Sequence, residues 1–385
     1  MNKSQPILEV FNDMDTHTSK EILGQPKLWA DVYKKIRNQE KEIHDFFKRE
    51  SINNSKNLNI ILTGAGSSAF IGEIAQYSFR KAGFKNTKAV PTTDLVTHFT
   101  DIVDVQKPLL LVSFGRSGNS PESIAAIKLA NKHCSEVSHL IISCNESGEL
   151  AQKANEPNTH AFILPPPAED QGLAMTGSFS GMVLAANIIS NINQLEKYEP
   201  IVSKTVQIGK KILQQYSKLL HEISNKDFTR VIFLGDGPLL GCARESHLKV
   251  QELSDGICLG KFDSFLGFRH GPKAVVNDNS LLIYLLSNDE NVIKYQYDLI
   301  KQISTQNLGM HSLAIGNTEE VNDYVDSYIQ IEDLDSLPET FLAIPYILIA
   351  QIIGFLKSKN LSLNPDNPSQ NGAISRVVEG VNIYI

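Results

Sequence analysis

Cysteine, basic residues and long apolar segments are scarce in this chain, and each scarcity excludes a class of protein. The cysteines form no close pairs and no metal-type spacing, so we expect reduced thiols and no bound metal. They are Cys134, Cys144, Cys242 and Cys258. The apolar runs are interrupted before membrane-spanning length, and the amino terminus lacks the charged start and apolar core of a signal peptide. We therefore expect a cytoplasmic protein with no membrane partner.

Positive charge is also in short supply. Lys and Arg number 36 against 43 Asp and Glu, which gives a net charge of −7. No basic block stands out, so we expect no nucleic-acid partner. A negatively charged ligand would have to be held by local groups. At 385 residues and 42% hydrophobic composition, the chain is long enough for two domains with separate cores.

The most informative stretch that is present runs from Leu109 to Lys132. It predicts a buried strand over 109–114, a polar loop over 115–120 and a helix that begins at Pro121 with Ser120 as its N-cap. A loop rich in hydroxyls that leads into a helix amino terminus is suited to bind an anion. An ordinary capped turn is the alternative for any one such loop.

A second loop of this kind lies upstream and favours the anion site. A strand over 59–63 is followed by Gly64-Ala65-Gly66-Ser67-Ser68 and then a helix over 69–83. Gly64-x-Gly66-x-x-Ala69 also fits the dinucleotide fingerprint. That fingerprint needs an acidic residue at the end of the next strand, and Asp94 comes too late. A phosphosugar site is therefore favoured over a redox cofactor site.

Strands and helices alternate along the whole chain, which predicts an α/β fold with parallel sheets covered on both faces. Further strands are expected at 87–90, 139–143, 161–164, 230–234, 281–286, 312–315 and 328–331. Further helices are expected at 149–154, 179–192, 201–223, 240–253, 292–308 and 339–357. Aligning Gly64 with Gly235 gives an offset of 235 − 64 = 171, and aligning Leu109 with Leu281 gives 281 − 109 = 172. Two matches at nearly one offset indicate a duplicated domain.

The two copies differ in the loops that matter. In the second copy Ser67-Ser68 is replaced by Pro238-Leu239, and the polar loop gains Asp and Glu, which repel phosphate. We therefore expect a single phosphate site, in the first domain, at the carboxyl ends of its strands. Ahead of both copies, Thr18-Ser19-Lys20-Glu21 predicts a short helix that Gly24 and Pro26 interrupt, with a longer helix from Pro26.

Several stretches together resemble one family: ILTGAGSSAFIGE, AVPTTDLVT, SFGRSGNSPES, GFRHGP and SRVVEGV. They are similar to the sugar isomerase (SIS) domain, and in particular to the AgaS-type double-SIS proteins of galactosamine catabolism. The resemblance implies two flavodoxin-like SIS domains, at 49–200 and 201–385, after an N-terminal helical arm at 1–48. It also implies deamination and isomerisation of D-galactosamine 6-phosphate to D-tagatose 6-phosphate and ammonia.

The same resemblance places the chemistry in the second half. Glu245, Lys249 and Glu252 share one face of a helix, a spacing that is also usual for a solvated, salt-bridged face. HLKVQELSDG is similar to the catalytic helix of glucosamine-6-phosphate synthase, which makes Glu252 the enolisation base and Lys249 the helix lysine. FRHGP is similar to a segment whose histidine assists ring opening from the neighbouring subunit. This implies a role for His270 and a homodimer or higher oligomer with the site at the subunit interface.

Substrate-binding residues follow from the same comparison. The phosphate loops supply Ser67, Ser68, Ser117 and Ser120. Arg116 departs from the neutral residue of many SIS loops, and it either contacts phosphate or pairs with an acid elsewhere. Thr176 and Ser178 match a segment that lines the sugar, although a plain helix cap explains them equally well. Arg376 in the tail either holds the substrate or closes the site.

Arg376 also argues against a covalent intermediate between the sugar and the tail. Arginine stays protonated and cannot form an imine with a ketose, unlike the tail lysine of the synthase. No glutaminase domain precedes the SIS pair, so we do not expect transfer of an amide nitrogen.

The expected reaction needs no cofactor. Glu252 would remove a proton from C2 of the open-chain sugar and return one to C1. Water would then hydrolyse the resulting 2-imine, so we expect both isomerase and hydrolase character. Two alternatives remain: a plain aldose–ketose phosphate isomerase, and a non-catalytic sugar-phosphate sensor.

Overall fold

The computed structural model describes residues 11, 15–49, 52, 57–378 and 380–385. The chain forms two compact units. The first-sheet unit contains residues 27–170, 177–202 and 374–385, and the second-sheet unit contains residues 1–26, 171–176 and 203–373. Residues 1–10 and 12–14 of the arm that we placed at 1–48 lie outside the described part, and its described remainder is divided at Pro26.

The first-sheet unit is built on a parallel five-stranded sheet in the order β2-β1-β3-β4-β5. Its strands are β1 (Asn59–Thr63), β2 (Thr87–Ala89), β3 (Leu109–Gly115), β4 (Val137–Ser143) and β5 (Thr159–Ile163). Its helices are α3 (Glu40–Phe47), α5 (Ser67–Lys81), α6 (Thr92–Ile102), α7 (Pro121–His133), α8 (Glu149–Gln152) and α9 (Gly177–Ile189), with 3₁₀ turns η1 (Lys153–Asn155), η2 (Pro166–Ala168) and η3 (Ile192–Lys197).

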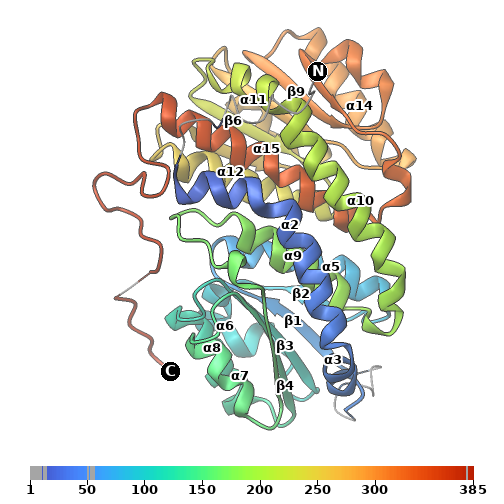
Figure 1. The fold of residues 1–385 in the computed structure, drawn as a ribbon, viewed down its shortest axis with the longest axis vertical. Helices are drawn as coiled ribbons and strands as arrows, with labels where there is room; N and C mark the ends of the chain where they lie inside the picture. Colours follow the sequence, from blue (N-terminus) through green and yellow to red (C-terminus); the bar gives the residue numbers. More distant parts are fainter. Residues whose placement is uncertain (1–10, 12–14, 50–51, 53–56, 379) are drawn as a thin grey trace. The chain divides into compact units, whose positions relative to one another are not determined.

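Alternation along these strands sends side chains to two cores. Ile61, Leu111 and Ile141 face one side and pack against α6 and α7. On the other side α5 packs against α9, whose residues are all buried. The sheet is therefore the middle layer of three (Figure 1), as predicted.

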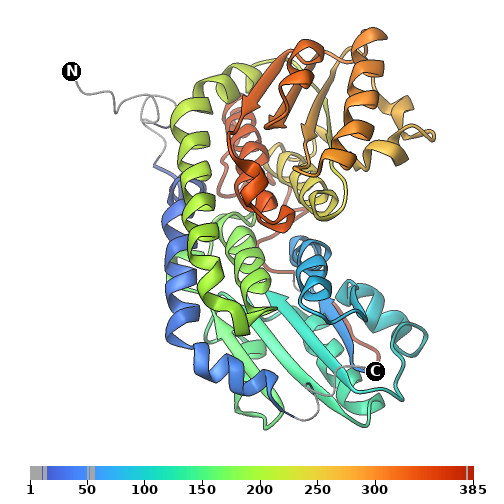
Figure 2. The same cartoon turned by 90° about the vertical axis from the view of Figure 1, so that its right-hand side faces the viewer.

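The second-sheet unit repeats this plan in the order β10-β9-β8-β6-β7. Its strands are β6 (Arg230–Leu234), β7 (Leu259–Asp263), β8 (Ser280–Leu285), β9 (His311–Gly316) and β10 (Ser327–Gln330). Its helices are α11 (Ser217–Ser224), α12 (Pro238–Leu253), α13 (Phe265–Phe268), α14 (Glu290–Thr305) and α15 (Glu339–Asn360), with the π-helical turn η4 (Ile212–Tyr216) and 3₁₀ turns η5 (Pro272–Val275), η6 (Glu319–Tyr324) and η7 (Leu334–Ser336). α13 and α14 cover one face, while α12 packs against α15 (Figure 2).

Strand register establishes the duplication. Asn59 pairs with Leu109 in the first sheet, and Arg230 pairs with Ser280 in the second. Both partners are shifted by the same distance, since 230 − 59 = 171 and 280 − 109 = 171. The offset of 172 that we derived from Leu281 is therefore wrong by one residue.

α15 corrects a second expectation. It is long and apolar enough to cross a membrane by length and composition, although we expected no run of that kind. However, 94% of its apolar window is buried inside the protein. The helix is apolar on all sides because it is surrounded by its own unit, where α11 and α12 pack against it.

The helix α2 (His17–Asn38) runs through Pro26, where we predicted an interruption. Proline cannot donate to the carbonyl four residues earlier, which belongs to Ile22. The side-chain amide of Gln25 donates to that carbonyl instead, at 3.4 Å. This substitute hydrogen bond explains how the helix continues.

Among the helices and strands, α6, α13 and β7 were not predicted. α6 follows Pro91 and contains a kink at His98, which hides its helical period. β7 is a partly exposed edge strand with the sequence LGKFD, so it lacks the apolar signature of the buried strands. The helix α10 (Tyr198–Lys211) leads into η4 and α11, where we expected one long helix.

Candidate active site

The strand order of the first sheet reverses between β1 and β3. Chain connections leave these two neighbours toward opposite sides of the sheet, which makes the loops at their carboxyl ends a topological switch point. Thr63 pairs with Ser113 there, so the loops at Gly64 and Gly115 begin side by side. The sequence predicted this juxtaposition, and the register confirms it.

The loop after β1 makes a turn that requires glycine. Gly66 has φ 56° and ψ −131°, which side chains rarely adopt. A Cβ at Gly64 would lie 2.6 Å from the backbone carbon of Ser68. Ser67 and Ser68 form the first turn of α5 and are 5% and 6% exposed. Both predicted phosphate ligands therefore lie at a helix amino terminus, where backbone N–H groups favour an anion.

The loop after β3 is held by the neighbouring strand. Ser143 donates to the carbonyl of Gly115 at 2.9 Å, and Asn145 donates to the carbonyl of Ser117 at 3.1 Å. Ser120 is the N-cap of α7 as predicted, but its hydroxyl donates to Glu122 at 2.6 Å and makes no side-chain capping bond. Ser117 and Ser120 are partly exposed.

Three hydroxyls that we did not propose as ligands lie around the same loops. Among the described residues, the side-chain oxygens of Thr63, Ser113 and Thr92 are buried without a hydrogen-bond partner. Thr63 and Ser113 are paired neighbours, and the backbone N–H of Thr92 donates to the carbonyl of Gly64 at 2.9 Å. A hydroxyl at a strand end close to a glycine turn was the signal that could have identified Thr63 and Ser113.

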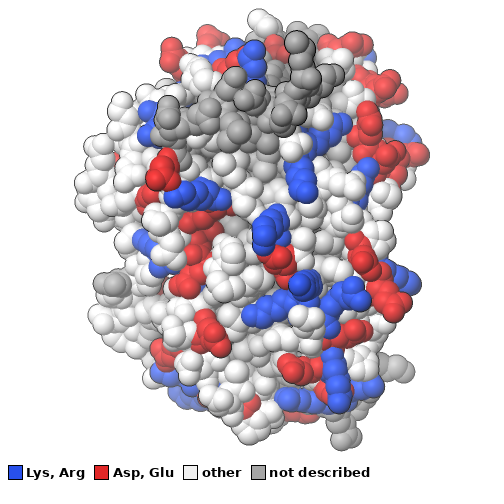
Figure 3. Space-filling model, viewed as in Figure 1, with Lys and Arg blue, Asp and Glu red and all other residues white. Residues whose placement is uncertain are grey.

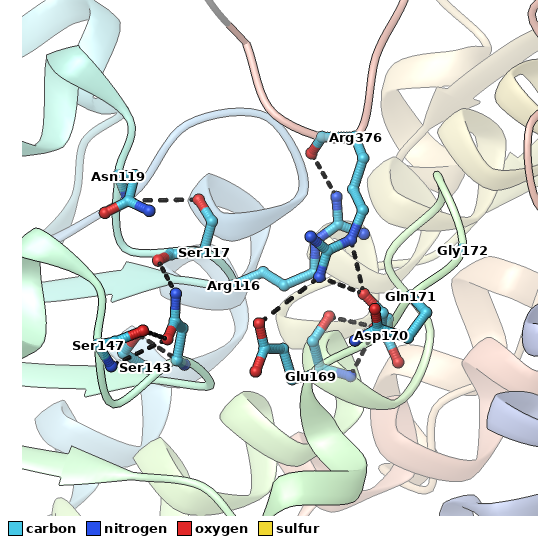
Figure 4. A network of polar contacts seen from close by, with 12 residues as sticks. Arg116, Ser117, Asn119, Ser143, Ser147, Glu169, Asp170, Gln171, Gly172 and Arg376 are labelled. Carbon is cyan, nitrogen blue, oxygen red and sulfur yellow. Dashed lines mark hydrogen bonds and ion pairs between the residues drawn. The ribbon is translucent and has the colours of Figure 1, made fainter.

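Arg116 lies in the phosphate loop but binds the C-terminal segment. Its side chain is buried, and Nη2 donates to the backbone carbonyl of Arg376 at 2.5 Å. Arg376 in turn donates from Nε and Nη2 to the carbonyl of Asp170, at 2.9 and 2.7 Å (Figure 4). This backbone carbonyl is a partner that we did not consider for Arg116, in addition to contact with phosphate and pairing with an acid.

Thr176 and Ser178 are buried and engaged with carboxylates of the protein. Thr176 donates to Glu21 at 3.0 Å within the second-sheet unit. Within the first-sheet unit Ser178 donates to Asp170, which also accepts the backbone N–H groups of Gly177 and Ser178. Ser178 thus belongs to the cap of α9, the plain explanation that we kept beside a role in sugar binding.

Two of the catalytic residues expected in the second half, Lys249 and Glu252, lie on α12. Lys249 is completely buried between two carboxylates, with Nζ 3.1 Å from Glu245 and 2.6 Å from Glu252. The side chain of Glu245 is also completely buried, whereas that of Glu252 is 21% exposed. The three residues share one face of the helix as predicted. They form a buried ion cluster, and the solvated face that was the alternative is wrong.

Two opposing influences act on Lys249. Burial lowers the pKa of its ammonium group, but the negative charges of Glu245 and Glu252 outweigh burial, so the pKa is raised. Lys249 is therefore a cation near neutral pH and cannot attack a carbonyl as a free amine. What it offers is positive charge and a proton donor, beside a carboxylate that reaches the surface.

His270 is exposed and follows the short helix α13. Its backbone N–H donates to the carbonyl of Gly267 at 3.0 Å, and Gly271 has φ 115°, a conformation that favours glycine. The preceding Arg269 donates to Gln302 at 2.8 Å. This turn presents the imidazole to solvent within the single chain.

Charge is mixed over one face of the molecule. Lys and Arg alternate with Asp and Glu over the face seen in Figure 3, without one dominant patch. Among the described residues no group of three His, Cys, Asp or Glu is arranged to hold a metal ion.

Comparisons with known proteins identify the family and agree with the fold. The SIS domain model matches residues 51–190. The D-galactosamine-6-phosphate deaminase AgaS of Escherichia coli is 38% identical over 377 residues, which is 96% of each chain. The protein of the same name from Shewanella sp. is 35% identical over 371 residues, 95% of this chain and 91% of the relative.

A solved structure matches equally broadly. The tagatose-6-phosphate ketose/aldose isomerase of Escherichia coli has a TM-score of 0.87 and 34% identity, and the alignment covers 97% of both chains. These three names describe a deaminase or an isomerase and not a hydrolase, which corrects the hydrolase class that we expected.

Proposed function

Because this chain belongs to the AgaS family of SIS-domain proteins, we propose that it converts D-galactosamine 6-phosphate to D-tagatose 6-phosphate and ammonia. The observation that carries the proposal is the pair on α12. Glu252, a partly exposed carboxylate, lies 2.6 Å from a buried ammonium. A base and a fixed cation side by side are what enolisation next to a carbonyl requires.

The phosphate is held by the first-sheet unit. The amino termini of α5 and α7 and the hydroxyls of Ser67, Ser68, Ser117 and Ser120 supply donors of the kind that bind phosphate oxygens. Because the phosphate does not react, these groups contribute mainly to substrate affinity.

Proton transfer belongs to the second-sheet unit. The Glu252 carboxylate removes the proton from C2 of the open-chain amino sugar, while the Lys249 ammonium stabilises the negative charge that develops on O1. O1 takes up a proton to give the enol, and return of a proton to C1 with loss of an N–H proton then leaves a carbon–nitrogen double bond at C2. Water adds to that bond and ammonia leaves, so the product is the 2-ketose.

The raised pKa of Lys249 indicates how the nitrogen leaves, by hydrolysis or through an imine with the protein. A protonated lysine forms no imine with the ketose, and arginine at position 376 has no free amine either. Nitrogen is thus lost to water and is not exchanged with the protein. A covalent adduct trapped by borohydride on Lys249 would contradict this route.

We further propose that His270 assists ring opening in the active site of a partner subunit, and that the protein is a homodimer in the cytoplasm. Support comes from the exposure of His270 and of three apolar side chains in the same unit, Ile257, Leu259 and Leu266, at 52%, 53% and 47%. Mixing Glu252→Gln with His270→Asn subunits tests the composite site. Recovered activity in the mixture, from two inactive parents, supports it, and no recovery argues for a site within one chain.

Ammonia release is the direct test of the reaction. The protein is incubated with galactosamine 6-phosphate and, separately, with glucosamine 6-phosphate, and ammonia and ketose are measured. We expect ammonia and tagatose 6-phosphate from the galacto sugar, and loss of both in Glu252→Gln. A Glu222→Gln variant, which removes an exposed carboxylate of α11, is the matched control.

The name of the solved relative favours one second candidate, a plain aldose–ketose isomerase. Interconversion of tagatose and galactose 6-phosphates without ammonia from either amino sugar would establish it. Tight binding of sugar phosphates without turnover would instead place the chain among sensors.

A further inference from the structure

We propose that Arg116 is a positioning residue that fastens the C-terminal segment to the phosphate loop, and that it does not bind the phosphate itself. The contacts that carry this proposal run from Arg116 to Arg376 and from Arg376 to Asp170. We call these contacts the tail latch. All three residues belong to the first-sheet unit.

The first contact engages the guanidinium of Arg116. This side chain is 7% exposed and donates to the backbone carbonyl of Arg376 at 2.5 Å. A guanidinium remains charged when it is buried, so it needs acceptors that offset the loss of water. The tail carbonyl is one such acceptor, and it comes from a residue 260 positions away in the sequence.

The second contact fixes the other side of the same tail residue. The side chain of Arg376 makes two hydrogen bonds to the carbonyl of Asp170, and Glu169 lies 3.8 Å from Nη2. Asp170 is itself immobilised, because its buried carboxylate accepts the N–H groups of Gly177 and Ser178 at the start of α9. The tail is thus held at both its backbone and its side chain (Figure 4).

These contacts couple three parts of one unit: the loop after β3, the tail and the amino end of α9. The loop is also the element that we expect to bind phosphate. Loss of Arg116 should therefore release the tail first, with a smaller effect on the loop itself, which Ser143 and Asn145 hold independently.

Trypsin offers a direct test, because it cleaves after arginine. The carbonyl that Arg116 binds belongs to the Arg376–Val377 peptide bond, and the side chain that trypsin must capture is bound to Asp170. In Arg116→Gln we expect cleavage at this bond to be at least tenfold faster than in the wild type. The release of residues 377–385 is followed by mass spectrometry. Arg116→Lys, which keeps the charge but lacks the planar fork, should give an intermediate rate.

Two controls separate the latch from general loosening. Arg37→Gln removes an exposed arginine of the same unit that lies 3.9 Å from Glu199, and it should leave the cleavage rate unchanged. Glu169→Gln weakens a longer, partly exposed contact and should change the rate less than twofold. Unfolding midpoints of all variants show whether the fold is intact, and if Arg116→Gln does not fold, Arg116→Lys decides.

Affinity for inorganic phosphate tests the alternative that Arg116 is a phosphate ligand. We expect Arg116→Gln to bind phosphate within about threefold of the wild type. Unchanged cleavage overturns the latch, and so does a loss of phosphate affinity of tenfold or more without faster cleavage, since Arg116 would then be a phosphate ligand.

One consequence rests on the proposed function. If the tail helps to order the site, Arg116→Gln should raise KM for galactosamine 6-phosphate about fivefold. The proteolysis requires no substrate, so it decides the latch even if the wild type turns over no sugar.

Discussion

The topological switch points of the two sheets have the same backbone conformation but are surrounded by different side chains. Strand order and register repeat at one offset, and the turn glycines Gly66 and Gly237 have nearly the same dihedral angles, φ 56° and ψ −131° against φ 53° and ψ −128°. Duplication has therefore preserved the turn that leads into each helix. The side chains around that turn have diverged.

In the second sheet the protein's own groups occupy this position. Pro238 stands at the first helical position of α12, so one backbone N–H is missing there. Asp236 accepts hydrogen bonds from the N–H of Phe265 and from Gln296, and Ser287 donates to Glu339 at 2.5 Å. The other carboxylate oxygen of Glu339 lies 3.5 Å from where a Cβ on Gly237 would be.

A carboxylate of α15 thus lies at the amino end of α12, at the position equivalent to the one where we propose that α5 binds phosphate. With the phosphate site that we propose in the first sheet, the fold supplies an anion-binding position twice. The side chains decide whether a ligand or the protein itself fills it. The second copy has instead placed charged residues further along α12, where the proposed chemistry lies.

The largest difference between the units should appear in catalysis. Glu252→Gln removes the proposed base and should lower kcat about 10²–10⁴-fold with little change in KM, because a positioned base contributes at about this level. Steady-state kinetics on galactosamine 6-phosphate measures both constants. A variant that keeps more than a tenth of the wild-type kcat would exclude Glu252 as the base.

The second-largest effect should be a loss of stability when the ion cluster of α12 is broken. Lys249→Met leaves two carboxylates without their cation and should cost about 3–5 kcal/mol in the free energy of unfolding. Urea unfolding measures it, with the exposed Lys218→Met as control. A loss under 1 kcal/mol would mean that the cluster contributes little.

The pH dependence of this effect has a definite sign. In the wild type the raised pKa of Lys249 means that its contribution is present below about pH 10 and is lost as the pH rises through the folded-state pKa. In Lys249→Met the buried Glu245 favours its protonated form. The deficit should therefore be smaller at pH 5 than at pH 8.

The first-sheet unit contains its own pH-sensitive group away from the loops. Burial lowers the pKa of His139 to about 4, and Asn131 binds its ring at 2.8 Å. The unfolded chain takes up a proton near pH 6.5 and the folded chain near 4, so stability is lost as the pH falls between these values. Between pH 7 and pH 4.5, the free energy of unfolding of His139→Gln should fall by about 2–3 kcal/mol less than that of the wild type. Equal acid losses in both proteins would show that His139 is not responsible.

The smallest effects should come from single hydroxyls at the two switch points, and they should differ in the quantity that changes. Ser117→Ala removes a proposed phosphate donor and should raise KM about tenfold while stability stays within about 0.5 kcal/mol. Ser287→Ala removes the donor to Glu339 and should cost about 1–2 kcal/mol of stability with KM unchanged. If both variants shift the same quantity, the proposed division of roles between the copies is wrong.

Much of the fold could be read from local patterns. Buried strands such as β1 and β6 are short apolar runs ended by glycine turns, so their position and parallel pairing followed from the sequence. Elements with a mixed or interrupted pattern did not follow: β7 is an exposed edge, and α6 is kinked. The passage of α2 through Pro26 depends on a side-chain hydrogen bond that no propensity encodes.

Some features of the candidate site could likewise be predicted from the sequence, and others could not. The sequence by itself determined the glycine turns, the serine loops and the spacing of Glu245, Lys249 and Glu252, because these depend on neighbours within a few residues. Only the tertiary structure decided that this helix face is buried, that Arg116 binds Arg376 and that Ser178 caps α9 through Asp170. Burial and long-range hydrogen bonds arise when distant segments pack together, and packing also determined that Glu339 fills the second switch point.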